Sequence, residues 1–260
     1  MQKKNIVIVG AGFAGINTYL SLVKRLKPHE SQITLINKTN YFLFTPMLHE
    51  VATGSLSEDV VVESVRSIIY KTNSSFLVSE VQNIDLDKKV VHTQNTDISY
   101  DYLVLAYGAT TDFYGIPGAE GRVFVLKDLA EAIALRSHFV SVFERASTMQ
   151  DKEARRKMLS FAVVGGGPTG VELVAEMADL FFETLRKYYK GEICKEDITL
   201  YLVHKGNDLL PMFDHALRKN SFDVLVKKGV KVLLGKEVKE IDTDGIIFAD
   251  NTCIQVANIV

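Results

Sequence analysis

The feature that most constrains the fold is a glycine pattern that occurs twice along the chain. The first copy occupies residues 10–15, Gly-Ala-Gly-Phe-Ala-Gly, and the second occupies residues 165–170, Gly-Gly-Gly-Pro-Thr-Gly. Each copy follows a short apolar run rich in β-branched residues and precedes a stretch with helical periodicity and then a second apolar run. Strand, glycine turn, helix and strand in this order are typical of the dinucleotide-binding βαβ unit. Two such units predict two domains of similar design, each holding its own nucleotide.

The three glycines of the pattern have separate physical roles. The first permits a tight turn, the second lets the backbone approach a pyrophosphate, and the third lets the helix pack closely on the strand. The phosphates then lie at the helix N-terminus, where backbone N–H groups have no partner within the helix. A glycine turn that binds nothing is the plain alternative at either copy. The residues predicted to bind the nucleotide at the first copy are Gly10, Gly12, Phe13, Ala14 and Gly15. Those predicted to bind it at the second copy are Gly165, Gly167, Pro168, Thr169 and Gly170.

Composition excludes several classes of protein. A count of 30 Lys+Arg against 32 Asp+Glu leaves a formal net charge of -2, and 47% of the residues are hydrophobic. This balance excludes a disordered chain and a dedicated nucleic-acid binder. Cys194 and Cys253 form no Cys-x-x-Cys pair and the histidines lack metal-ligand spacing, so we predict no metal and a reducing, cytoplasmic compartment. No uninterrupted apolar run reaches the roughly 20 residues that a membrane-spanning helix needs.

Sequence patterns elsewhere in the chain predict a further nucleotide contact, two helices and a loop. An apolar run at residues 100–105 ends in Ala106-Tyr107-Gly108, where a backbone poor in side chains can lie close to a ligand, so Ala106 and Gly108 join the cofactor-binding candidates. Residues 56–70 and 128–146 are predicted to be amphipathic helices. The charged run at residues 151–157 is predicted to be a solvated loop.

Two longer strings carry a resemblance to a known family. Residues 40–54 are Asn-Tyr-Phe-Leu-Phe-Thr-Pro-Met-Leu-His-Glu-Val-Ala-Thr-Gly, and residues 165–176 are Gly-Gly-Gly-Pro-Thr-Gly-Val-Glu-Leu-Val-Ala-Glu. Together they closely resemble type II NADH dehydrogenases, within the superfamily of FAD- and NAD(P)-binding pyridine nucleotide-disulfide oxidoreductases. Disulfide reductases of that superfamily carry a redox cysteine pair in the helix after the second strand, and sulfide:quinone oxidoreductases need cysteines near the flavin. This chain has a thiol in neither context.

The resemblance implies an α/β fold with two Rossmann-like dinucleotide-binding domains built on parallel sheets. It assigns residues 1–115 to the N-terminal part of an incomplete FAD-binding domain and residues 116–260 to an inserted NAD(P)H-binding domain. The implied reaction passes hydride from NADH to FAD and two electrons on to a membrane quinone, without proton pumping. The implied FAD contacts are completed by Asn37, Lys38, Pro46 and Val81.

Glu172 is the catalytic residue that the resemblance implies. It follows Gly170 by two residues, in the first turn of the second predicted helix, where it would organise nicotinamide or quinone. Glu176 follows four residues later on the same helix face. A glutamate in a first turn also suits the helix dipole without any further function, and that alternative stays open.

Two positions depart from the dinucleotide-binding pattern. The acidic residue that usually binds ribose hydroxyls at the end of the second strand is replaced by Asn37 in the first unit and by His204, followed by Lys205, in the second. Asn can still accept a hydrogen bond from a hydroxyl, so FAD binding is retained. Loss of a carboxylate and gain of cationic capacity remove the repulsion that rejects a 2′-phosphate. We therefore predict NADH as cofactor with weakened discrimination against NADPH, unless His204 is a strand-end residue and backbone contacts do the recognition.

The resemblance also sets expectations for the whole protein. Family members continue beyond the position of Val260 into the second half of the FAD domain and into amphipathic helices that dock on the membrane, so a C-terminally truncated chain is expected. A full-length form is expected at the cytoplasmic face of the inner membrane, with a homodimer as one option. Two alternatives stay open: a flavin-dependent NAD(P)H reductase with a soluble or protein acceptor, and an inactive nucleotide-binding module.

Overall fold

The structure, a computed structural model, describes residues 3–70, 72 and 74–260. It divides into two compact units. Unit 1 consists of Met1–Phe44 and Glu58–Thr110, and unit 2 consists of Thr45–Ser57 and Thr111–Val260. The predicted division into nucleotide domains at residues 115 and 116 stays a prediction.

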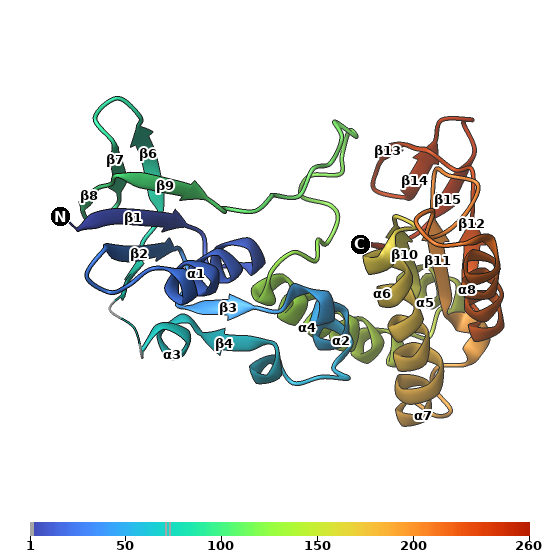
Figure 1. The fold of residues 1–260 in the computed structure, drawn as a ribbon. Coiled ribbons are helices and arrows are strands. Elements are labelled where there is room, and N and C mark those ends of the chain that lie inside the picture. The colour runs from blue at the N-terminus through green and yellow to red at the C-terminus, as the bar shows by residue number, and fades with distance from the viewer. Residues whose placement is uncertain (1–2, 71, 73) are drawn as a thin grey trace. The chain divides into compact units, whose positions relative to one another are not determined.

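Unit 1 is built on a parallel sheet with the strand order β5-β2-β1-β9 (Figure 1). The chain runs from β1 through α1 to β2 and β5, and then returns to the other side of β1 as β9. Val9 lies opposite Ile36 of β2 and opposite Leu105 of β9, so these strands end at one edge. The bounds are β1 Lys4–Val9, α1 Phe13–Arg25, β2 Ser31–Asn37, β5 Ser74–Val78 and β9 Tyr102–Leu105.

Both faces of this sheet are covered, which explains why its strands are apolar at nearly every position. Ile6 and Ile8 point to the face where α1 buries Tyr19, whereas Val7 and Val9 point to the opposite face. That second face is covered by an antiparallel sheet of β6 Val81–Asp85, β7 Val90–Thr93 and β8 Asp97–Ser99.

Residues 56–70 do not form the single helix that the sequence pattern predicts. They contain a 3-10 turn at Glu58–Val60, the strand β4 Val62–Ser64 and the short helix α3 Val65–Ile69. β4 pairs antiparallel with β3 Tyr41–Leu43. Three consecutive valines at 60–62 favour extended backbone, and the partner strand far away in sequence stabilises it there.

Unit 2 repeats the design with a parallel sheet in the order β12-β11-β10-β16 (Figure 1). The helix after its glycine turn, α6, continues through a π-helical stretch at Asp179–Leu185 into α7 Arg186–Tyr188. The predicted α/β class, with a parallel sheet in each half, is confirmed. The bounds are β10 Ser160–Val164, α6 Pro168–Ala178, β11 Thr199–Val203, α8 His215–Lys228, β12 Lys231–Leu233 and β16 Asn258–Ile259.

Helix α4, Leu129–Ser147, confirms the helix predicted at residues 128–146. Its first turn is closed by a capping box in which Asp128 and Glu131 bond to each other's backbone N–H groups. Its buried face carries Phe139 and Phe143, which contact Phe161 of β10 and Phe181 of the π-helical stretch. These four rings form the aromatic core of unit 2.

Three further pieces complete unit 2. An antiparallel sheet is formed by β13 Val238–Ile241, β14 Gly245–Phe248 and β15 Cys253–Gln255. The segment Thr45–Ser57 contributes a 3-10 turn at Thr45–Met47 and the helix α2 Leu48–Thr53, which packs on α4 and α6. The third piece, α5 Lys152–Met158, is a helix where a solvated loop was predicted.

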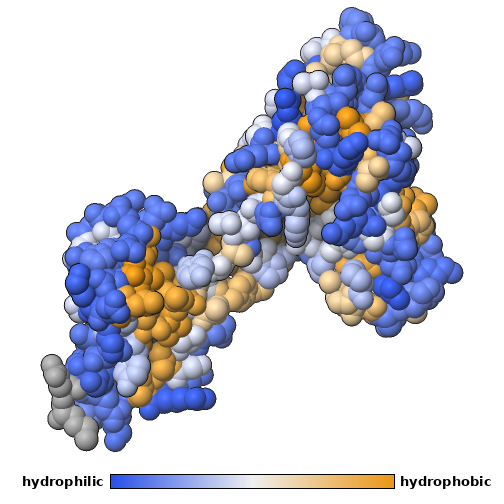
Figure 2. Space-filling model, turned by 90° about the horizontal axis from the view of Figure 1, so that it is seen from above, coloured by the Kyte–Doolittle hydropathy of each residue, from blue (hydrophilic) through white to orange (hydrophobic). Residues whose placement is uncertain are grey.

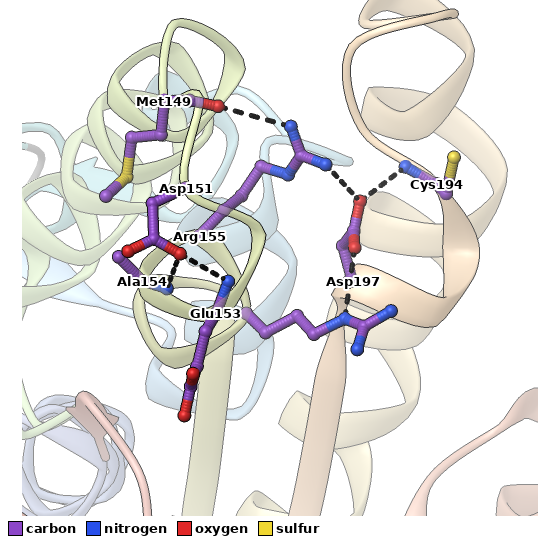
Figure 3. Close-up of polar contacts among 8 residues, drawn as sticks. Met149, Asp151, Glu153, Ala154, Arg155, Cys194 and Asp197 are labelled. Atoms are coloured by element: carbon purple, nitrogen blue, oxygen red, sulfur yellow. Dashed lines mark hydrogen bonds and ion pairs between the residues drawn. The ribbon is translucent and has the colours of Figure 1, made fainter.

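A buried carboxylate explains why the charged run at residues 151–157 is ordered (Figure 3). Asp151 caps α5 by accepting hydrogen bonds from the backbone N–H groups of Glu153 and Ala154. One turn later, Arg155 and Arg156 each lie 3.3 Å from the Asp197 carboxylate. The Asp197 side chain is only 4% exposed, so its charge is compensated by α5 rather than by water.

The face drawn in Figure 2 is mostly hydrophilic and carries several apolar patches. In the part of the chain that the structure describes, no helix combines the length and the apolar character required to cross a membrane.

Candidate functional site

The first glycine turn fills its space so tightly that two of its positions have no room for a side chain. The Gly10 N–H donates to the Ile36 carbonyl at 2.8 Å, and Gly10 has a φ of 103°. A Cβ on Gly10 would lie 2.2 Å from the Ala106 carbonyl oxygen, and one on Gly15 would lie 1.8 Å from the Gly10 carbonyl oxygen. The tight turn and the close approach of helix to strand therefore both exist, as the pattern predicts.

Gly12 has the opposite surroundings, because a Cβ there would meet nothing within 4 Å. Gly12 is also the N-cap of α1, which has no side-chain cap and no acidic residue in its first turn. The first N–H groups of α1 thus face open space beside a residue without a side chain. An anionic pyrophosphate suits this arrangement, since helix N-termini favour negative charge.

Asn37 braces the first turn from the end of β2. Its Oδ1 accepts a hydrogen bond from the Ala11 N–H at 3.1 Å, and its Nδ2 donates to the carbonyl and hydroxyl oxygens of Thr39 at 3.0 Å. The sequence pattern predicts a contact of Asn37 with a ribose hydroxyl, and the structure adds this second role in holding the turn. Lys38 beside it is exposed.

The remaining candidates for the first nucleotide are distributed over both units. Ala106 follows β9 and donates its N–H to Val9, whereas Gly108 has a φ of 77° with open space around it. Val81 begins β6 and packs into the core under the sheet. Pro46 is exposed in the 3-10 turn Thr45–Met47, which belongs to unit 2.

An aromatic cluster beside the first turn was missed by the sequence analysis. The Phe13 ring, at the start of α1, lies 5.0 Å from the Phe42 ring and 5.5 Å from the Phe44 ring. Phe13 and Phe44 are partly exposed. The repeated aromatics at residues 41–44 were the available signal for a flat apolar surface at this turn.

The second glycine turn repeats the close packing at its last glycine and the open space at its N-cap glycine, whereas a Cβ on Gly165, unlike one on Gly10, would meet nothing within 4 Å. The Gly165 N–H donates to the Val203 carbonyl at 2.9 Å, and Gly165 has a φ of 130°. A Cβ on Gly170 would lie 2.0 Å from the Gly165 carbonyl oxygen, whereas one on Gly167 would meet nothing within 4 Å. Gly167 is the N-cap of α6, and Pro168 occupies the first helical position, where its missing N–H costs no hydrogen bond.

His204, at the end of β11, is part of this turn. Its Nδ1 accepts a hydrogen bond from the Gly166 N–H at 3.1 Å, so that nitrogen carries no proton. Burial, and then the charge of Lys205, lower the pKa of His204 below its ordinary value. The sequence pattern predicts cationic capacity at both residues, but this geometry keeps His204 neutral at pH 7. The cationic capacity therefore belongs to Lys205, whose Nζ lies 5.9 Å from the centre of the Tyr114 ring.

A cavity of about 440 Å³ opens beside the second turn within unit 2. One wall is the turn itself, including Gly165, Gly167 and Thr169. The other walls are mostly apolar and come from the loop at residues 111–126, from the antiparallel sheet and from β16, with Phe113, Ile116, Phe124, Val238 and Ile259 among the lining residues. Backbone donors on one side and apolar walls on the other suit a flat polar ring joined to phosphate.

Glu172 and Glu176 lie on one face of α6, and each carboxylate meets a side chain of the segment Thr45–Ser57. A Glu172 oxygen lies 3.7 Å from Nδ1 of His49, and a Glu176 oxygen accepts a hydrogen bond from the Ser55 hydroxyl at 2.7 Å. The Glu172 side chain is 50% exposed. No local sequence pattern connects His49 or Ser55 with these glutamates, since 121 residues separate Ser55 from Glu176.

Comparison with known proteins finds matches along nearly the whole chain. The family described as pyridine nucleotide-disulphide oxidoreductase matches residues 4–260. The external alternative NAD(P)H-ubiquinone oxidoreductase B3 of Arabidopsis thaliana mitochondria is 34% identical over 255 residues, covering 93% of this chain and 43% of the relative. The type II NADH:quinone oxidoreductase Ndh of Mycobacterium tuberculosis is 34% identical over 257 residues, covering 96% and 54%.

Solved structures agree with these relatives. NDH2 from Plasmodium falciparum in complex with NADH has a TM-score of 0.89 and 29% identity, with 99% of this chain and 54% of that chain covered. The sulfide:quinone oxidoreductase of Aquifex aeolicus has a TM-score of 0.77 at 20% identity over 98% of this chain and 57% of its own, and this likeness concerns the fold alone. The chain spans about half the length of the curated relatives it matches.

Proposed function

The chain belongs to the pyridine nucleotide-disulphide oxidoreductase family, and on that premise we propose that it acts as a type II NADH:quinone oxidoreductase without proton pumping. The observation that carries the proposal is the pair of glycine turns, each with open space beside an uncapped helix N-terminus. Two separate dinucleotide sites in one chain suit electron transfer between two nucleotide cofactors. Support also comes from relatives that are named NADH-ubiquinone or NADH:quinone oxidoreductases.

FAD is proposed for the turn of unit 1. Gly10 and Gly15 give that turn its shape, and Gly12, with the first residues Phe13 and Ala14 of α1, would face the pyrophosphate. Asn37 holds the loop from β2 through the Ala11 N–H. When bound, FAD would supply the chemistry of accepting a hydride and passing on two electrons.

NADH is proposed for the turn of unit 2. Gly167, Pro168 and Thr169 would face its pyrophosphate at the N-terminus of α6, and the adjoining apolar cavity would exclude water from the nicotinamide. Lys205 follows His204, which stands where a carboxylate would otherwise bind the ribose, so NADPH is expected to bind as well. The names of several relatives, such as the Arabidopsis protein, include NAD(P)H.

Glu172 is proposed to orient the nicotinamide or the quinone. Its carboxylate is half exposed on α6, the helix that begins at the second glycine turn. A carboxylate accepts hydrogen bonds only, so it would bind an amide N–H or a quinol hydroxyl. The proposed acceptor is a membrane quinone, which the protein would reach by peripheral association with the cytoplasmic face of the inner membrane.

A spectroscopic experiment tests this function against its alternatives. The purified chain is expected to be yellow, to bleach when NADH is added under anaerobic conditions, and to recolour when a short-chain quinone follows. Bleaching with recolouring only by a soluble or protein acceptor would favour a different reductase. A colourless protein that binds NADH without turnover would favour an inactive nucleotide-binding module.

A matched variant separates flavin binding from folding. Gly12→Ala places its Cβ in open space, so the melting temperature is expected to stay within a few degrees of the original value. The same Cβ would occupy the space proposed for the pyrophosphate, and bound flavin is expected to fall at least tenfold. Unchanged flavin content in this variant would contradict the assignment of FAD to unit 1.

A further inference from the structure

Helix α2 presents a histidine to the acidic face of α6. Four of its six residues, Leu48 and Val51 to Thr53, are buried where α2 packs on α4 and α6. The other two are His49 and Glu50, and the His49 side chain is only 13% exposed. The His49 side chain is therefore surrounded mainly by protein groups rather than by water.

Both ring nitrogens of His49 face carboxylates. Nδ1 lies 3.7 Å from a Glu172 oxygen, and Nε2 lies 3.9 Å from a Glu50 oxygen. These are ion-pair distances, and an imidazolium at this position would be compensated on both sides. Glu172 and Glu50 are both carboxylates. An uncharged His49 would therefore not offset the negative charge of either one.

The remaining charged groups around α2 come from the helices packed on it. α6 contributes Glu176, whose oxygen accepts the Ser55 hydroxyl, and α4 contributes Arg136, whose Nε would lie 2.9 Å from a Cβ on Gly54 at the end of α2. Arg136 is thus placed at the C-terminal end of α2 and His49 near its N-terminal end. His49 is the group with an ion-pair contact to Glu172 among the described residues.

We propose that His49 is a positioning residue for Glu172, acting through charge. The inference rests on the proposed function, in which Glu172 faces the nicotinamide or the quinone. An imidazolium at His49, 3.7 Å from the Glu172 carboxylate, would hold that carboxylate and offset its charge, so that a nucleotide with a negative pyrophosphate would meet less repulsion at α6. The affinity for the nucleotide would then depend on the charge of this pair, which binding measurements at several pH values can detect.

The test measures nucleotide affinity without turnover. The nonreactive analogue 1,4,5,6-tetrahydro-NAD is titrated into the flavin-containing chain by calorimetry at pH 6.0, 7.0 and 8.0. In the unmodified chain, the dissociation constant is expected to rise threefold to tenfold from pH 6.0 to pH 8.0. In His49→Gln, the dissociation constant is expected to be the same at all three pH values and to equal that of the unmodified chain at pH 8.0.

Glu172→Gln provides a second variant with His49 intact. Its dissociation constant is expected to be nearly independent of pH, because no charge remains for His49 to cancel. The double variant is expected to equal Glu172→Gln alone, since the two residues act as one unit. Ser55→Ala is the matched control on the same segment, and it is expected to keep the pH dependence of the unmodified chain.

Each contrary outcome has a distinct meaning. If His49→Gln runs parallel to the unmodified chain from pH 6.0 to 8.0, or if the two variants are additive, His49 does not position Glu172 and the inference is wrong. If the analogue does not bind at all, or if Glu172→Gln changes neither affinity nor pH dependence, the assignment of Glu172 in the proposed function fails first. A change in melting temperature common to His49→Gln and Ser55→Ala, with pH dependence retained in both, would show a structural role only.

Discussion

Neighbouring glycines of the second turn have opposite surroundings, which predicts opposite effects of the same substitution. A Cβ on Gly166 would lie 2.6 Å from the His204 ring, whereas one on Gly167 would meet nothing within 4 Å. Gly166→Ala is expected to lower the free energy of unfolding by about 1–3 kcal/mol, because the half-buried His204 ring must move. Gly167→Ala is expected to change it by less than about 1 kcal/mol but to weaken NADH binding at least tenfold. Urea unfolding and calorimetric titration measure the two effects, and equal loss of stability in both variants would contradict this reasoning.

Lys205 is the second residue for which we predict a specific change. The unmodified chain is expected to prefer NADH over NADPH by less than roughly a hundredfold in kcat/KM, about 2.7 kcal/mol. Lys205→Glu removes the cation and adds the repulsion that rejects a 2′-phosphate, so NADPH affinity is expected to fall about tenfold or more. NADH carries no 2′-phosphate, so its affinity is expected to change less than about threefold. Equal losses for both nucleotides would show that Lys205 does not face the 2′ position.

The two turns show which residue-scale features can be predicted from sequence. The tight turn at Gly10 and the close packing at Gly15 follow from backbone sterics, which a local pattern contains. The hydrogen bond from Gly166 to His204 does not, because it depends on the orientation of a ring 38 residues away. The same holds for the contact of His49 with Glu172, which exists only because α2 packs on α6. The nucleotide contacts of both turns stay predictions.

At the scale of elements, α5 depends on a single buried carboxylate (Figure 3). The Arg155 side chain is 12% exposed and that of Arg156 is 58% exposed, although both pair with Asp197. Asp197→Asn is expected to lower the free energy of unfolding by about 3 kcal/mol, because it leaves the covered Arg155 charge without a partner. The matched variant Arg156→Ala is expected to cost under about 1 kcal/mol, since its ion pair is solvated. Chemical denaturation followed by circular dichroism distinguishes them, and similar losses would contradict the difference in burial.

The elements that were predicted correctly carry their own signals. Helix α4 has its capping box and apolar face within residues 128–147, so local sequence is sufficient.

Two other segments differ from the prediction because their partners lie far away in sequence. Residues 56–70 form a turn, a strand and a short helix because β4 pairs with β3, about 20 residues earlier. The run at 151–157 is helical because Asp197, which lies 41 residues after Arg156, compensates its arginines. Long-range pairing partners of this kind are invisible to a local pattern.

At the scale of the whole molecule, both units place a glycine turn at the same topological point. In unit 1 the chain leaves β1 toward β2 and returns as β9 on its other side, and in unit 2 β10 stands in the same way between β11 and β16. Open α/β sheets bind ligands at the carboxyl edge of such a strand, where neighbouring connections diverge. The repeated topology therefore explains why one sequence pattern predicts two sites, and why their candidate residues come from the ends of several strands.

Two histidines of unit 2 are expected to make the stability of that unit depend on pH. Burial lowers the pKa of His138, which donates from Nε2 to Asn258, and burial followed by the Lys205 charge lowers that of His204. A histidine with a lowered pKa binds fewer protons when folded than when unfolded, so its contribution is complete above pH 6.5 and is lost as pH falls through the folded value. We expect the free energy of unfolding to be level from pH 7 to 8 and to fall toward pH 5.5, with a slope of up to about 1.4 kcal/mol per pH unit for each histidine. His138→Gln, which retains a donor for Asn258, is expected to reduce that slope. Urea titrations at pH 5.5, 6.5, 7.0 and 8.0 measure it, and a slope that is unchanged in the variant would show that acid acts elsewhere in the molecule.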